Sequence, residues 1–127
     1  MIHTKEQLES IRKVEKVFSD YIDSHDDMEL IYTKKAGYVL LYGLQRNERK
    51  LAMDPVFIVD GEHLCDFLLF EIVHDVLREV GSGHDVDEIT AEERSIMEKA
   101  FEPYLQQLPE YRELGPLQFA DSEENCE

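Results

Sequence analysis

Residues 29–42 read ELIYTKKAGYVLLY, two short apolar segments on either side of a turn that contains two lysines. The segments are rich in Ile, Leu, Val and Tyr, most of which favour β-strands. Gly37, at the end of the turn, can adopt a positive φ angle without steric cost, as tight hairpins require. The stretch therefore predicts a β-hairpin formed by residues 29–32 and 38–42.

A third extended segment follows at residues 51–59, after a polar and basic connection at residues 45–50. Pro55 interrupts this segment. Because proline has no amide hydrogen to donate to a neighbouring strand, it marks an edge, a bulge or a break between two pieces. The simplest arrangement of the three segments is a three-stranded antiparallel meander.

Helical patterns flank the predicted meander. Residues 5–23 carry apolar side chains at three- and four-residue spacing, after a capping box made by Thr4 and Gln7. After the meander, Asp60 is a good N-cap for a long apolar helix that extends through Val80. A helix that is apolar over most of its circumference is normally contacted from two sides. We therefore expect the second helix to be central.

The last predicted helix covers residues 90–108 and begins with a second capping box, made by Thr90 and Glu93. Pro103 lies within it and removes one backbone hydrogen bond, which predicts a kink or a restart. The order helix, strands, helix, helix indicates an α+β fold, with the two C-terminal helices packed with the N-terminal helix and the meander.

The length of 127 residues is typical of one domain. We expect residues 1–116 to form this single α+β domain and residues 117–127 an acidic, flexible tail. No apolar run approaches the ~20 residues of a transmembrane helix. Cys65 and Cys126 form neither a disulfide framework nor a zinc-binding spacing. These features favour a cytoplasmic protein with two reduced thiols.

The formal net charge of −16 is unevenly distributed along the chain. Residues 1–59 hold 10 acids and 9 bases (net −1), whereas residues 60–127 hold 19 acids and 4 bases (net −15). This charge disfavours direct binding to nucleic acid or to an anionic membrane, because both depend on Lys and Arg. It favours basic protein partners, whose association an acidic surface accelerates.

Eight acidic residues on the two C-terminal helices and the loop between them are candidates for a partner-binding surface. They are Glu71, Asp75, Glu79, Asp85, Asp87, Glu88, Glu92 and Glu93. A surface of one charge sign suppresses wrong partners as well as attracting the right ones. The alternative, that the acidity only keeps the protein soluble, stays open.

A second candidate site lies on the predicted central helix. Glu71 and His74 have the Glu-x-x-His spacing that places a carboxylate and an imidazole on one helix face, as in carboxylate-bridged di-iron bundles. His63 and Asp66 extend this polar stripe, so the alternative metal site consists of these four residues. Such bundles need two of these motifs and further glutamates, and the chain has one motif. A solvent-facing polar edge of the helix explains the stripe more simply.

No segment matches a catalytic or cofactor motif, so the sequence predicts no catalytic residue and no cofactor. We expect a non-enzymatic protein-interaction module (an inhibitor, an immunity-type protein or a nucleic-acid mimic) whose acidic C-terminal half binds a basic partner. One alternative is a metal-dependent enzyme or small-molecule binder that uses the polar stripe. Another is a structural or oligomerisation module that pairs with a second copy through the central helix or an open strand face.

Overall fold

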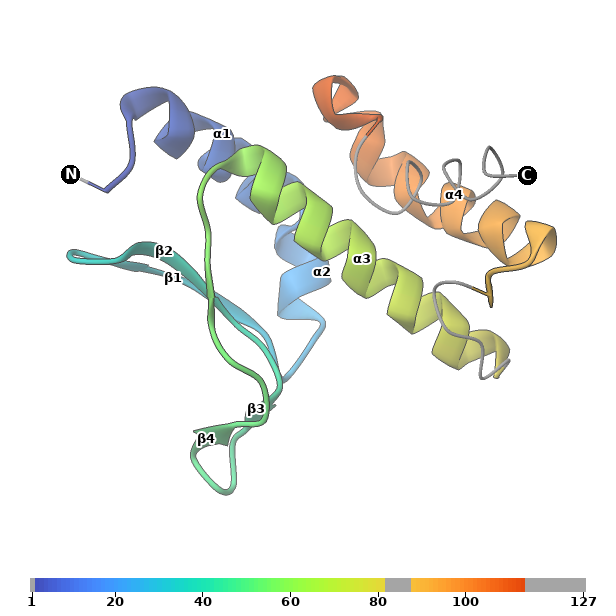
Figure 1. Ribbon diagram of the computed structural model, residues 1–127, viewed down its shortest axis with the longest axis horizontal. Helices are drawn as coiled ribbons and strands as arrows, with labels where there is room; N and C mark the ends of the chain where they lie inside the picture. The colour runs from blue at the N-terminus through green and yellow to red at the C-terminus, as the bar shows by residue number, and fades with distance from the viewer. Residues whose placement is uncertain (1, 82–87, 114–127) are drawn as a thin grey trace. The chain divides into compact units, whose positions relative to one another are not determined.

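In the computed structural model, two antiparallel strands form the predicted hairpin (Figure 1). They are β1 (Glu29–Thr33) and β2 (Gly37–Leu41). Gly37 has a φ of 72°, which confirms that the turn needs a residue tolerant of the left-handed region. The amide of Ala36 donates to Thr33 Oγ1 at 2.9 Å, which helps to close the turn.

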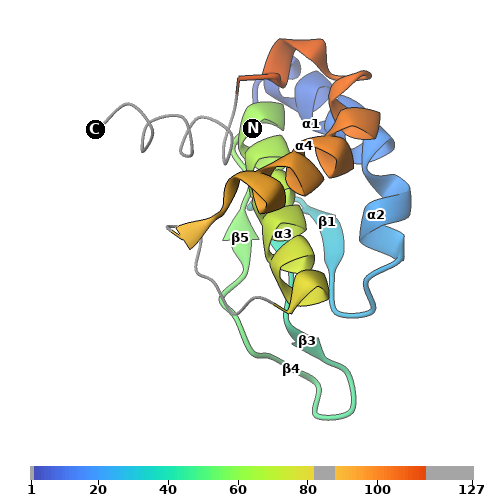
Figure 2. The same ribbon diagram turned by 90° about the vertical axis from the view of Figure 1, so that its right-hand side faces the viewer.

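The third strand confirms the antiparallel sheet and shows what Pro55 does. Strand β5 (Val56–Phe57) pairs with β2, giving the order β1-β2-β5. Pro55 separates it from β4 (Lys50–Leu51), which pairs instead with β3 (Leu44–Gln45) in a second, two-stranded sheet. The proline is therefore a break between two pieces, and the basic connection is the tip of a small hairpin, visible beyond the larger sheet in Figure 2.

The N-terminal helix is interrupted, and the prediction of one helix over residues 5–23 is wrong at one position. The structure has α1 (Lys5–Val17) and α2 (Ser19–Asp23), separated by Phe18 with a ψ of 8°. The Ser19 hydroxyl donates to the Lys16 carbonyl at 3.1 Å, a local bond that competes with regular helix geometry. The apolar spacing continues across the break, because Phe18 is fully buried.

The N-terminal segment is attached to β2 through His3, which the sequence did not single out. His3 is 4% exposed, and its Nε2 accepts a hydrogen bond from the Tyr38 amide at 3.0 Å. On the same side of β2, the Ile58 amide donates to the Tyr38 carbonyl at 2.9 Å. His3 therefore satisfies a strand amide that β5 does not reach. Nearby, a hydrogen bond to Tyr38 raises the pKa of the Arg12 guanidinium above its ordinary value.

Helix α3 (Gly61–Val80) begins and ends as the sequence predicts. Asp60 Oδ1 accepts from the His63 amide at 2.9 Å, the bond expected of an N-cap. Gly81, with a φ of 63°, follows the last helical residue. At the other end the Gly61 amide donates to Ser10 Oγ at 2.8 Å, so this glycine lies directly against α1.

Helix α4 (Ala91–Leu105) begins with the predicted capping box of Thr90 and Glu93. It continues through Pro103 for two residues instead of restarting there. The proline removes one internal bond, because it has no amide hydrogen to donate. A short 3-10 helix, η2 (Pro109–Tyr111), follows α4.

The structure describes residues 2–81 and 88–113. These residues divide after Leu64 into two compact units, each with its own buried side chains. In the first unit the largest fully buried side chains are Phe18, Ile11, Leu40, Leu64 and Val14. In the second they are Phe101, Leu68, Leu69, Leu108, Val73 and Cys65. The predicted single domain stays a prediction, and the predicted tail lies outside the described residues. None of the described helices is both long and apolar enough to cross a membrane.

The capping box of α4 gives a first testable prediction. Replacing Thr90 by Ala removes the side-chain acceptor for the Glu93 amide, 3.1 Å away, and should lower the free energy of unfolding by about 1 kcal/mol. Ser95, which is exposed in the middle of the same helix, is the matched control, and Ser95→Ala should change stability by less than about 0.5 kcal/mol. Urea denaturation measures both. Equal effects would mean that the cap contributes nothing specific.

Candidate protein-interaction surface

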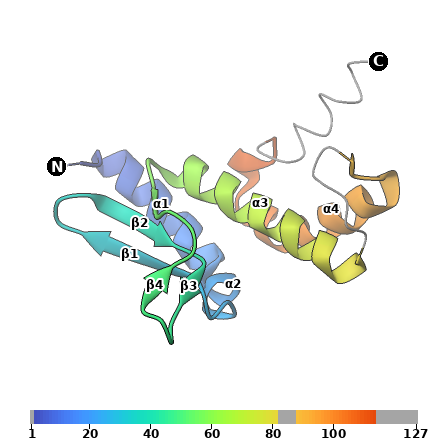
Figure 3. The same ribbon diagram turned by 60° about the horizontal axis from the view of Figure 1, so that its bottom comes forward.

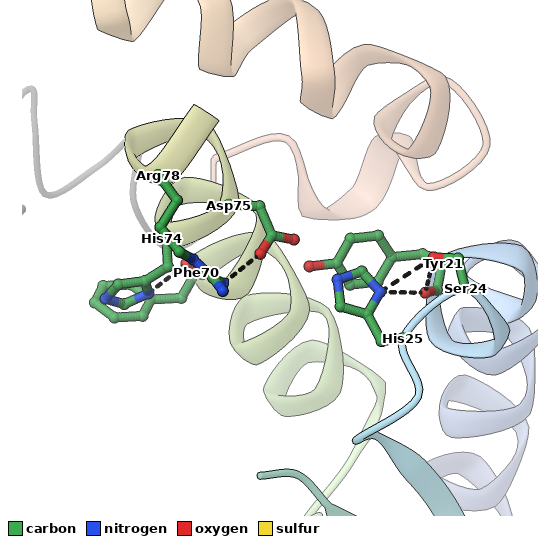
Figure 4. A network of polar contacts seen from close by, with 7 residues as sticks. All are labelled: Tyr21, Ser24, His25, Phe70, His74, Asp75 and Arg78. Carbon is green, nitrogen blue, oxygen red and sulfur yellow. Dashed lines mark hydrogen bonds and ion pairs between the residues drawn. The ribbon is translucent and has the colours of Figure 1, made fainter. Parts of the chain in front are cut away.

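The three candidate acidic residues of α3, Glu71, Asp75 and Glu79, recur every four residues and therefore lie along one side of the helix. Glu71 and Asp75 are half-buried, and Glu79 is exposed. Asp75 Oδ1 is 2.6 Å from Arg78 Nη2, so its charge is partly neutralised within the same helix (Figure 4). Of these three carboxylates, Glu79 is the one most open to a partner.

The five candidate acidic residues between α3 and the first turn of α4 fall into three groups. Glu88 and Glu92 are exposed. Glu93 is only 6% exposed and its Oε1 accepts from the Thr90 amide at 2.9 Å, so it serves as a helix cap. The capping-box pattern itself already indicated this role. Asp85 and Asp87 lie outside the described residues, so the described surface, here called the α3–α4 acidic surface, consists of Glu71, Asp75, Glu79, Glu88 and Glu92.

Three of the four basic residues of the C-terminal half are held by acids of the same unit. Arg78 pairs with Asp75, as described above. Arg94 Nε lies 3.3 Å from Glu98 Oε1, and Arg112 Nη2 lies 3.0 Å from Glu102 Oε1. None of these three cations is paired with Glu79 or Glu92. Among the described residues, these two exposed glutamates hold no ion pair.

The Arg112–Glu102 contact is bidentate, with a second bond of 3.3 Å from Nη1 to Oε2. The hydrogen bond from Arg112 lowers the pKa of Glu102 and raises that of Arg112. Because the carboxyl pKa is lower in the folded chain, any stability from the pair is present near neutral pH. It is lost as the pH falls through the folded-state pKa. The contact joins η2 to α4 and leaves both groups neutralised.

Both histidines of the alternative metal site contact backbone groups four residues earlier in the chain. His63 Nδ1 accepts from the Val59 amide at 3.0 Å, at the start of α3. His74 Nδ1 is 3.1 Å from the Phe70 carbonyl, and its ring centroid lies 4.7 Å from that of Phe70 (Figure 4). Asp66 and Glu71 are half-buried between them along the helix. Within residues 2–81 and 88–113, no three His, Cys, Asp or Glu side chains gather as metal ligands would.

Two further side chains, the thiol of Cys65 and the imidazole of His25, are of types that often take part in catalysis. Cys65 is fully buried, and burial raises the pKa of its thiol to about 12, so it stays protonated near neutral pH. His25 Nδ1 lies 2.8 Å from the Tyr21 carbonyl and 3.1 Å from Ser24 Oγ, at the end of α2 (Figure 4). Like His74, His25 contacts the backbone carbonyl of the residue four positions earlier in the chain.

Comparison with known proteins identifies no relative: no protein-family model matches the chain, and neither a curated protein nor a solved structure does.

Proposed function

We propose that the chain is a non-enzymatic protein-interaction module that binds a basic partner protein through the α3–α4 acidic surface. The observation that carries the proposal is the pairing of Arg78, Arg94 and Arg112 with acids of their own unit. These pairs leave Glu79 and Glu92 exposed and uncompensated in a half of the chain that carries −15.

The ion pairs matter because they decide where the negative field is concentrated. An exposed ion pair has little net field beyond a few ångströms, whereas carboxylates without a nearby cation add to one another. Glu79 is at the end of α3 and Glu92 is in the first turn of α4, with residues 81–90 as the connection between the two helices. Asp85 and Asp87 belong to that connection, so the sequence adds two further acids to the same junction.

A partner that fits this surface carries clustered Lys and Arg, as nucleic-acid-binding proteins and basic toxins do. Occupying such a basic site would make the chain an inhibitor, an immunity-type protein or a nucleic-acid mimic. Opposite charges steer the encounter, and like charges exclude acidic proteins. The free thiol of Cys65 is compatible with a reducing compartment such as the cytoplasm.

The test uses two variants of equal net charge. The site variant carries Glu79→Gln, Glu88→Gln and Glu92→Gln; the control carries Glu9→Gln, Asp20→Asn and Asp54→Asn, all at exposed positions of the N-terminal unit. Immobilised chain is incubated with a cell lysate, and captured basic proteins are identified and quantified. We expect the wild type and the control to capture the same basic protein. The site variant should lose it by about tenfold or more, because three charges of the field are removed.

Two outcomes would contradict the proposal. If both variants lose the captured protein equally, net charge and not the α3–α4 acidic surface is responsible. If no basic protein is captured even at about 0.05 M salt, where charge screening is weak, the acidity serves solubility.

A further inference from the structure

Strand β1 forms an outer edge of the three-stranded sheet. It pairs with β2 on one side only, and no other described strand pairs with it (Figure 3). Tyr32 on this strand is 53% exposed although it is a large aromatic residue. An open strand edge presents unpaired amide and carbonyl groups, to which another extended chain can bind.

The hydrogen bonds of β2 show which groups of β1 point outward. The Tyr38 carbonyl accepts from Ile58, so the backbone of Tyr38 faces away from β1 and that of Val39 faces toward it. Val39 is opposite Ile31, whose backbone is therefore directed at β2. It follows that the amides and carbonyls of Leu30 and Tyr32 point to the open edge.

We propose that two copies of the chain pair antiparallel through β1, with Ile31 on the two-fold axis. In this register Leu30 of one copy is opposite Tyr32 of the other, so all the outward-pointing groups of both strands form hydrogen bonds. Shifting the register by one residue would place outward-pointing groups opposite inward-pointing ones.

The charges around β1 favour the antiparallel orientation. Asp26 and Asp27 precede the strand, and Lys34 and Lys35 follow it; all four are exposed. Antiparallel pairing about Ile31 brings the two aspartates of each copy next to the two lysines of the other. Parallel pairing would place like charges together, which is unfavourable. The edge is therefore complementary to itself in one orientation only.

A small cavity lies where the tyrosine of the second copy would be. It has a volume of about 130 Å³ and is lined by residues of α1, α2 and β1 and by the residue before β1; they include Glu15, Ile22, Asp23, Met28, Glu29 and Leu30. Directly opposite residues of an antiparallel pair lie on the same sheet face. Tyr32 of the second copy would therefore stand beside Leu30 at this cavity, where its ring contacts apolar atoms and its hydroxyl can donate to a carboxylate.

The distribution of charge along the chain also favours self-association through the N-terminal half. Two copies that carry −15 in residues 60–127 repel each other there, whereas residues 1–59 carry −1. Repulsion between like-charged surfaces opposes association. Of the two halves, the first is the one in which two identical surfaces can meet without a large electrostatic cost.

The test is a charge exchange between two variants. One carries Lys34→Glu and Lys35→Glu, and the other carries Asp26→Lys and Asp27→Lys. Each variant alone brings like charges together at both ends of the pair, whereas an equimolar mixture restores opposite charges. Sedimentation velocity over a concentration series measures association. We expect a wild-type dimer, a rise of about tenfold or more in the dissociation constant of each variant, and recovery in the mixture.

Lys5→Glu with Arg46→Glu is the control of equal net charge to the lysine variant, because these positions lie outside β1 and its flanking residues. It should dimerise like the wild type. A wild-type chain that stays monomeric at the highest concentration overturns the proposal. So does dimerisation of both charge variants, or a mixture that stays monomeric. The capture experiment above uses other residues, so the two proposals can fail separately.

Discussion

Gly37→Ala is expected to destabilise the chain by about 2–4 kcal/mol, the sum of a backbone cost and the loss of a buried hydrogen bond. Two costs combine at this position. The φ of 72° is unfavourable for a residue with a Cβ, at about 1 kcal/mol. A Cβ would also collide with His3 Nε2, so the imidazole must move and the buried Tyr38 amide loses its acceptor, at about 1–3 kcal/mol.

Gly81 is the matched control, because its φ of 63° is similar and a Cβ there would meet nothing within 4 Å. Gly81→Ala should therefore show only the backbone cost of about 1 kcal/mol. In a His3→Ala background, Gly37→Ala should likewise cost about 1 kcal/mol, because the collision is gone. Chemical denaturation of the four variants gives these values. If Gly37→Ala costs no more than Gly81→Ala, the His3 contact is not as described.

Phe18→Ala is the second large effect, with an expected loss of about 3–5 kcal/mol. Phe18 is fully buried at the break between α1 and α2, so alanine leaves a cavity beside an irregular turn. Phe57, which is 62% exposed on β5, is the control: Phe57→Ala should cost about 1 kcal/mol or less. Thermal or urea unfolding compares the two. Similar losses for both residues would mean that Phe18 is not part of the core.

Most of the fold could be predicted because the ends of its helices and the turn of its main hairpin depend on residues close together in the sequence. The two capping boxes, the Asp60 cap and the positive φ of Gly37 each follow from neighbouring residues in the sequence. The break at Phe18 could not be predicted from periodicity, because apolar residues on both sides keep the helical spacing. The β3–β4 hairpin was missed because its strands have two residues each and its tip is polar.

The negative charge of the candidate surface could be predicted from the sequence. Which of its carboxylates are available to a partner could be predicted less well. Net charge needs only counting, but whether a carboxylate is available depends on its partners in space. Glu93 is buried in a capping box and Asp75 is paired with Arg78, whereas Glu79 is exposed. The role of His3 depends on Tyr38, 35 positions further along the chain. No local pattern contains that contact.

The most direct test of the proposed function is the association rate constant for the basic protein recovered in the capture experiment, measured by surface plasmon resonance at increasing salt. We expect the rate constant of the wild type and of the Glu9, Asp20 and Asp54 control to fall about tenfold or more between about 0.05 and 0.5 M salt. The Glu79, Glu88 and Glu92 variant should already be slow at low salt and should depend less on salt. Equal salt dependence for all three chains would contradict binding through the α3–α4 acidic surface.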